Sequence, residues 1–134
     1  MGNVNLLAVL VAALGGFLVG GLWYGPLFGA AWRKEVGISE EEIGKTNPIK
    51  LFGLTFLCSV ISAVMLGHLF ARIGVTRPQI IMMISTGIAA GFIIPAIGTN
   101  YLFGRKSGKL FAIDAGYWLT FYAVMGAVYA ILGT

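Results

Sequence analysis

Residues 5–34 read NLLAVLVAALGGFLVGGLWYGPLFGAAWRK and contain no charged side chain before Arg33. The apolar part of this stretch is long enough to cross the roughly 30 Å hydrocarbon core of a bilayer. Small residues recur at every fourth position, at Ala8, Ala12, Gly16 and Gly20. Apolar helices in lipid have no hydrophobic reason to associate, and such a stripe lets two backbones come close and gain dispersion contacts. We therefore expect a membrane-spanning helix that packs closely against a neighbour.

Three further apolar stretches have the length of a spanning helix. Together with the first, the predicted spans cover about residues 5–28, 51–70, 79–103 and 110–132, each close to the roughly 20 residues required. Backbone polar groups in lipid must be satisfied within their own segment, so helices are the expected state. The predicted fold class is an all-α membrane protein, with residues 1–134 forming one transmembrane four-helix domain. Small-residue stripes are expected to pack the helices, with Gly16 and Gly20 in the first span and Gly87 and Gly91 in the third.

The loop after the first span holds most of the polar sequence. Within it, Ser39 and Glu42 match a capping box, and Ile38 and Ile43 match the hydrophobic staple that accompanies one. This pattern predicts a short amphipathic helix in the first loop, ending near Gly44.

Composition excludes several classes of function. The chain is 58% hydrophobic and 10% charged, against roughly 25% charged residues in an average soluble domain. Its net charge of +4 comes from loop residues that form no basic face, so we expect membrane lipids as partners and no nucleic acid. One cysteine, Cys58, and one histidine, His68, are too few for a zinc, iron–sulfur or haem site, and we expect no metal and no cofactor.

The cations are unevenly distributed between the loops. The first and third loops carry seven Lys or Arg residues: Arg33, Lys34, Lys45, Lys50, Arg105, Lys106 and Lys109. The second loop carries Arg72 and Arg77, and the segments before the first span and after the last carry none. The positive-inside rule therefore predicts that loops one and three are cytoplasmic and that both termini lie outside.

Asp114 is the only acid inside a predicted span. A carboxylate at membrane depth is costly unless it is paired or faces water, so it is a functional hypothesis by default. The alternative is an interfacial ion pair with a neighbouring cation, Lys109, Lys106 or Arg105.

A polar and aromatic set can be drawn around Asp114. Trp118 and Tyr122 follow at i+4 and i+8 on the same helix face, and Asn100, Tyr101, Trp23 and Tyr24 lie at the same membrane side. The candidate pocket or path comprises Asp114, Trp118, Asn100, Tyr101, Tyr122 and His68, the last as a pH-responsive group near the outer end of the second span. The alternative is ordinary packing with interfacial aromatics and a headgroup contact of His68.

Three blocks of sequence resemble a known family. They are the opening N-x-N-x-x-A-V, the block Gly-x-Leu-Trp-Tyr-Gly-Pro-Leu-Phe-Gly-x-x-Trp at residues 20–32, and Leu-Phe-x-Ile-Asp-Ala-Gly-Tyr at residues 110–117. Over nearly the whole chain they resemble the bacterial membrane family called domain of unknown function 1761. That family often has Asn where Asp114 stands and His where Trp118 stands. The resemblance implies a small four-helix protein of the bacterial cytoplasmic (inner) membrane and supplies no activity.

Three functions remain open at this point. The favoured interpretation is a structural or accessory membrane protein that packs with itself, as a homo-oligomer, or with a larger membrane complex. The runner-up is a small oligomeric channel or transporter for an ion or small solute. A lipid-modifying enzyme is the third, and we expect no enzyme because the spans hold no nucleophile–base pair, no paired carboxylates and no phosphate-binding loop.

Overall fold

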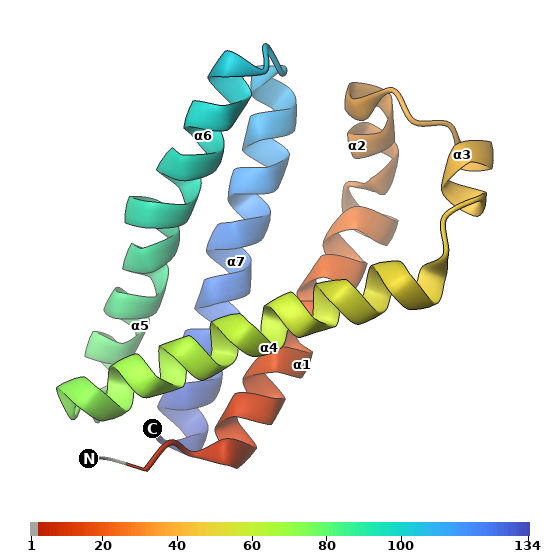
Figure 1. Cartoon of the computed structure of the whole chain (residues 1–134). Coiled ribbons are helices and arrows are strands. Elements are labelled where there is room, and N and C mark those ends of the chain that lie inside the picture. Colours follow the sequence, from red (N-terminus) through yellow and green to blue (C-terminus); the bar gives the residue numbers. More distant parts are fainter. Residues whose placement is uncertain (1–2) are drawn as a thin grey trace.

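The computed structural model describes residues 3–134, and all of its regular secondary structure within that range is helical (Figure 1). Four helical spans, Leu6–Leu27, Pro48–Ile73, Pro78–Phe103 and Gly108–Leu132, are long and apolar enough to cross a membrane. The protein is therefore an all-α, multi-pass membrane protein, as the sequence predicted.

The second and fourth spans begin earlier than the apolar pattern alone indicated. Helix α4 (Pro48–Ile73) is capped by Asn47, whose side chain accepts from the backbone N–H groups of Ile49 and Lys50. Helix α7 (Gly108–Leu132) is capped in the same way by Ser107. The caps satisfy backbone donors at the start of each helix, so each helix extends into polar sequence that hydropathy does not mark.

The other two spans each contain a π-helical turn. The first consists of α1 (Leu6–Leu22) and η1 (Trp23–Leu27), and the third of α5 (Pro78–Ile88), η2 (Ala89–Ile93) and α6 (Ile94–Phe103). Pro26 lies inside η1, and Pro95 follows η2 by two residues. A proline lacks the N–H of the α-helical ladder and crowds the carbonyl four residues earlier, and a wider turn accommodates it.

The first loop contains two short helices. Helix α3 (Glu40–Gly44) starts where the capping box predicted, with the Ser39 hydroxyl accepting from the Glu42 backbone N–H at 3.1 Å. Helix α2 (Gly29–Val36) was not predicted, because its residues are polar at one end and apolar at the other. It ends at Gly37, whose positive φ of 80° suits a residue without a Cβ.

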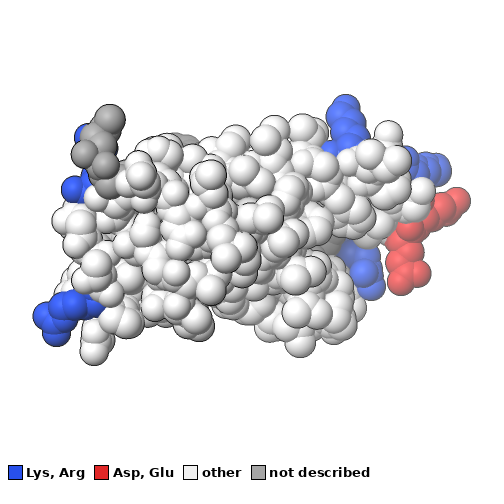
Figure 2. Space-filling view, turned by 90° about the horizontal axis from the view of Figure 1, so that it is seen from below, with Lys and Arg blue, Asp and Glu red and all other residues white. Residues whose placement is uncertain are grey.

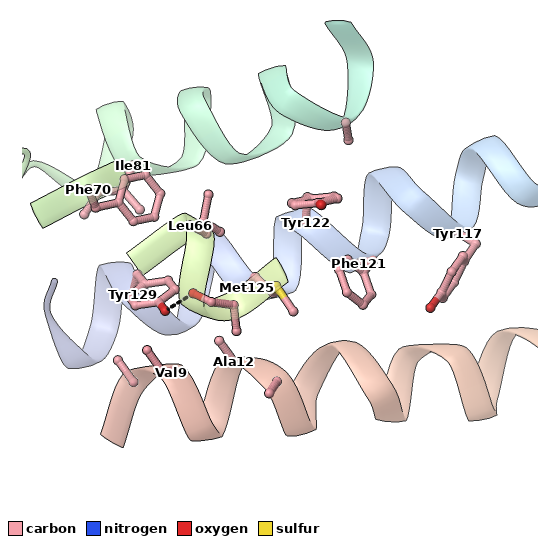
Figure 3. Packing of buried hydrophobic residues seen from close by; sticks show 14 residues of the cluster. Val9, Ala12, Leu66, Phe70, Ile81, Tyr117, Phe121, Tyr122, Met125 and Tyr129 are labelled. Atoms are coloured by element: carbon pink, nitrogen blue, oxygen red, sulfur yellow. Dashed lines mark hydrogen bonds between the residues drawn. The ribbon is translucent and has the colours of Figure 1, made fainter. Parts of the chain in front are cut away.

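Helix α7 forms the centre of the molecule, between α1 on one side and α5 on the other (Figures 1 and 3). Its inward residues Phe121, Met125 and Tyr129 are at most 2% exposed. The small residues Ala8 and Ala12 of α1 are fully buried in the same core. A stripe without bulky side chains thus allows the aromatic residues of α7 to fill the space between the helices.

Helix α4 crosses the others at a steep angle and packs against α1 (Figure 1). Two hydrogen bonds to helix carbonyls attach it: Ser59 Oγ donates to Ala13 O at 2.7 Å, and Tyr129 OH donates to Ala63 O at 2.6 Å. None of its residues before Ser59 is buried. The first part of α4 therefore lies at the surface of the bundle, where the rings of Phe52 and Phe56 meet Phe17 of α1 edge to face.

Charged side chains gather at two opposite ends of the face seen in Figure 2, and the broad middle of that face has none. At one end Ser107, in the third loop, donates to Glu35 of α2 at 2.7 Å. At the other, Asn5 Nδ2 donates to Leu132 O at 3.0 Å, and Thr134 Oγ1 donates to Val75 O at 3.0 Å. Loops one and three share one end, and the second loop lies with the segments beyond the first and last spans at the other.

Candidate functional site

Asp114 lies in the second turn of α7, at the end of the molecule that carries loops one and three, and is 9% exposed. Each of its carboxylate oxygens accepts a hydrogen bond from a tyrosine hydroxyl. Tyr24, in η1, donates to Oδ1, and Tyr101, in α6, donates to Oδ2. Residues from three spans thus converge on one carboxylate.

The π-helical turn η1 is held against α7 by Trp23, next to Tyr24. The indole Nε1 of Trp23 donates to Ile113 O at 2.9 Å. Its ring lies on Gly116, where an added Cβ would be 2.9 Å from Cζ2 of the ring. Because Gly116 has no side chain, the indole can pack directly against α7. This contact positions the neighbouring Tyr24 so that its hydroxyl reaches Asp114.

Asp114 lies at the wall of an open pocket of about 360 Å³. The residues that line this pocket, here called the Asp114 pocket, are Tyr24, Trp32, Val36, Tyr101, Lys106, Leu110 and Asp114. Three of them are aromatic, and the rings of Tyr24 and Trp32 meet edge to face with centroids 5.7 Å apart. The pocket therefore combines one carboxylate with aromatic and aliphatic walls.

The ion pair considered from the sequence does not form. Within residues 3–134 the one ion pair joins Arg33 to Glu40 at 3.6 Å. The Lys106 ammonium instead lies over the ring of Tyr101, 5.0 Å from its centroid. Asp114 is hydrogen-bonded by neutral phenols, and its charge has no cationic partner within 4.0 Å.

The remaining predicted residues lie elsewhere. Trp118 lines a second, largely apolar cavity of about 560 Å³ beside α1 and α4. Tyr122 is buried in the core, and its backbone carbonyl accepts a hydrogen bond from the Ser85 hydroxyl. Asn100 is exposed on α6. His68 is exposed on α4 next to Gly67, which touches Tyr129, about four helical turns along α7 from Asp114. Of the other five predicted residues, only Tyr101 contacts Asp114. The rings of Trp118 and Tyr122 meet each other instead, with centroids 6.4 Å apart.

The interior along the inward face of α7 is filled by side chains (Figure 3), while the second cavity lies beside it and shares Tyr24 with the Asp114 pocket. Tyr117, Phe121, Met125 and Tyr129 follow one another along α7, and each is at most 7% exposed. In the described part of the chain the pocket is thus a recess at one end of the bundle, and buried side chains close the route along α7 toward the other end.

The four glycines predicted to pack helices fall into two pairs. A Cβ on Gly16 would lie 2.6 Å from Phe121, and one on Gly20 would lie 3.3 Å from the Tyr117 hydroxyl, so this pair packs α1 on α7. Gly87 and Gly91 are exposed, and a Cβ on either would meet nothing within 4 Å. The second pair has no packing role within one chain.

Four residues of the Asp114 pocket were not assigned to it from the sequence: Trp32, Val36, Leu110 and Lys106, the last considered only as an ion-pair partner of Asp114. Trp32 follows Tyr24 by eight residues, and it reaches the same pocket because α2 continues beyond η1 toward the same end. Lys106 reaches the pocket from the short turn after α6. The spacing of eight is a signal for Trp32 only if the helix is expected to continue past Pro26, and a proline in a helix interior normally kinks or breaks the helix.

Groups of three or more His, Cys, Asp or Glu side chains that could hold a metal ion do not occur in residues 3–134. The comparison with protein families matches residues 7–130 to the family described as protein of unknown function (DUF1761). No curated protein and no solved structure matches the chain.

Proposed function

This chain belongs to the DUF1761 family, and we propose that it is a structural membrane protein that associates with a second copy of itself. The observation that carries the proposal is the outward face of the third span, defined by Met83, Gly87 and Gly91. This face is exposed, and nothing lies over its two glycines.

One face of the third span is buried against α7, and the opposite face is exposed. Its buried residues Ile81, Ser85 and Ala89 form one narrow stripe toward α7. Gly87 lies roughly 200° around the helix from Ser85, and Gly91 follows it one turn later. The outward glycines therefore lie opposite the side that the chain itself covers.

Glycine has a cost on a lipid-facing surface. In a helix interior it is less favourable than alanine by roughly 0.8–1 kcal/mol, because its backbone loses more freedom on ordering. Two glycines four residues apart in an apolar helix are typical of a face on which two identical helices cross closely, and backbone contact then offsets that cost. Because such a face is typical of a contact between identical helices, it favours a second copy of this chain over a different partner.

The native mass of gently extracted protein tests the proposal. We expect two chains for the wild type and one for the variant Gly87→Leu/Gly91→Leu, because two isobutyl groups hold the backbones apart. Loss of close contact is expected to weaken association by roughly tenfold or more, the equivalent of about 1.4 kcal/mol.

Gly53→Leu is the matched control. Gly53 is an exposed glycine of α4 with nothing within 4 Å of an added Cβ, so the same substitution there should leave the dimer intact. A monomeric wild type or a dimeric double variant would contradict the proposal. Co-extraction with a stoichiometric larger protein would replace it by an accessory role in that complex.

The runner-up, a small oligomeric channel or transporter, has one observation in its favour, the open pocket that reaches Asp114. The aromatic side chains beyond that pocket argue against a path inside one chain. A path between copies would have to be lined by exposed faces, and those near Gly87 and Gly91 are apolar. Flux of an ion or small solute through reconstituted protein, lost in Asp114→Asn, would favour this alternative.

We also propose the orientation of the chain and its location in the bacterial cytoplasmic membrane. The end that carries loops one and three holds seven of the nine Lys and Arg residues, and Ser107 and Glu35 join these loops. An excess of cations in short loops favours the cytoplasmic side. The other end, with the second loop and both termini, is then outside. An enzymatic role is not part of the proposal.

A further inference from the structure

We propose that the Asp114 pocket binds an organic ammonium group, with the cation against the Asp114 carboxylate and between the aromatic walls. This inference is independent of self-association through the third span.

The Asp114 carboxylate has no cationic partner in the pocket within 4.0 Å. Asp114 is buried, both of its oxygens accept from neutral hydroxyls, and no cation of the described chain lies within 4.0 Å of it. Phenol donors satisfy the hydrogen bonds of a carboxylate but leave its charge uncompensated. A buried charge without a partner is costly in a low-dielectric region, so a bound cation would stabilise the site.

Tyr24, Trp32 and Tyr101 present three aromatic rings to the pocket, and Val36 and Leu110 add aliphatic surface. Aromatic faces attract organic cations through the ring quadrupole, most strongly where water is excluded. The Lys106 ammonium lies over the Tyr101 ring, 5.0 Å from its centroid, so the rings of Tyr24 and Trp32 are the ones left to a ligand.

A pocket of about 360 Å³ falls in the range of small-ligand sites. A hard metal ion prefers six or more oxygen ligands, and the pocket offers a single carboxylate. The Asp114 carboxylate, the rings of Tyr24 and Trp32 and the aliphatic wall match an alkylammonium or methylated ammonium ion instead, with the Lys106 ammonium over the Tyr101 ring at the rim.

This chemistry has two sources, the headgroup of an ethanolamine lipid and a free amine. The pocket includes Lys106 of the third loop and Trp32 and Val36 of α2, so it lies at the end that carries loops one and three, where lipid headgroups lie. Lys106 separates the two sources, because its ammonium would attract the phosphate of a lipid headgroup and repel a free monocation.

Tetramethylammonium chloride is the probe for the binding experiment. Titration of the purified protein, followed by tryptophan fluorescence and calorimetry, should show saturable binding that sodium chloride at equal ionic strength does not reproduce. We expect Asp114→Asn to weaken binding by roughly tenfold or more and Trp32→Leu by several-fold, since the first removes the charge and the second an aromatic wall.

Both variants must keep the wild-type helical circular dichroism and native mass for the comparison to count. Trp32→Leu serves where Asp114→Asn fails to fold, because Trp32 makes no hydrogen bond to Asp114. Identical responses to tetramethylammonium and sodium, or binding unchanged in both folded variants, would overturn the proposal.

Two measurements distinguish a lipid headgroup from a free amine as the ligand. They are tetramethylammonium binding by Lys106→Met, and its binding by protein in nanodiscs of phosphatidylethanolamine or phosphatidylglycerol. If a lipid headgroup is the ligand, phosphatidylethanolamine competes with tetramethylammonium, phosphatidylglycerol does not, and Lys106→Met weakens that competition. If a free amine is the ligand, neither lipid competes and Lys106→Met tightens tetramethylammonium binding.

Discussion

Gly16 and Gly21 lie five positions apart on α1 and meet opposite surroundings. A Cβ at Gly16 would lie 2.6 Å from Phe121 and 3.0 Å from Met125, both on α7, whereas a Cβ at Gly21 would meet nothing within 4 Å. The distance between α1 and α7 is therefore set by the missing side chain at Gly16. The same residue type at Gly21 has no such role in the folded chain.

Gly16→Ala should destabilise the protein and Gly21→Ala should not. At Gly16 the added methyl group forces Phe121 or the helix itself to shift, at a cost of roughly 1–3 kcal/mol. At Gly21 the better helix propensity of alanine should leave stability unchanged or raise it by up to about 1 kcal/mol. Unfolding of both variants in the same detergent, followed by circular dichroism, measures the difference. Equal stabilities would show that α1 and α7 are not in close contact at Gly16.

At the scale of the elements, the junction between η1 and α2 positions the Asp114 pocket. Phe28 N–H donates to Trp23 O at 2.8 Å across the π-helical turn, and Gly29 then begins α2. A Cβ at Gly29 would lie 2.6 Å from the backbone oxygen of Tyr24. A backbone atom cannot move aside as a side chain can, so the junction requires glycine at position 29. The junction in turn positions Tyr24 and Trp32 in the wall of the pocket.

Gly29→Ala should therefore loosen α2 without unfolding the four spans. The measurement is limited digestion with trypsin, comparing cleavage after Lys34, inside α2, with cleavage after Lys45, in the exposed loop. We expect cleavage after Lys34 to rise several-fold relative to Lys45, since a protease cuts a helix only when it opens.

Gly25→Ala is the control, because a Cβ at Gly25 meets nothing within 4 Å. Its digestion pattern should match the wild type. If Gly29→Ala leaves the Lys34 to Lys45 ratio unchanged, the close approach of Gly29 to the Tyr24 carbonyl does not hold α2 in place.

At the scale of the whole molecule, the two charged ends flank an uncharged middle on the face seen in Figure 2. Loops one and three are joined by Ser107 and Glu35 at one end, and Thr134 reaches Val75 of the second loop at the other. The four spans must therefore alternate in direction, and the side assigned to one loop determines the side of every other.

The orientation can be measured with single cysteines in a Cys58→Ser background. On intact cells a membrane-impermeant maleimide should label Thr76→Cys, in the second loop, and should label Glu41→Cys, in α3, only after permeabilisation. Both positions are exposed. Labelling in the reverse order would place loops one and three outside and would contradict the positive-inside assignment.

Part of the candidate site could be predicted from the sequence. Asp114 was identified because it is the only acid in a span, and that inference needs only hydropathy and the cost of a charge in lipid. Its partners could not be chosen, because Tyr101, Asn100 and Tyr122 are equally plausible from spacing alone. The structure selects Tyr24 and Tyr101 and leaves His68 and Asn100 apart.

What the sequence by itself determined is the solvent, the four spanning helices and the short helix α3. Uncharged stretches of spanning length require helices in lipid, and the Ser39 cap and the small-residue stripe of α1 are local patterns that act within one helix. The tertiary structure alone decided which small residues pack within the chain and which aromatic residues reach Asp114. Gly16 and Gly87 look alike in the sequence, and only the rotation of each helix toward α7 makes one buried and the other exposed. That rotation follows from contacts between residues far apart in the chain, 90 positions for Trp23 and Ile113 and 37 for Ser85 and Tyr122, which local periodicity does not encode.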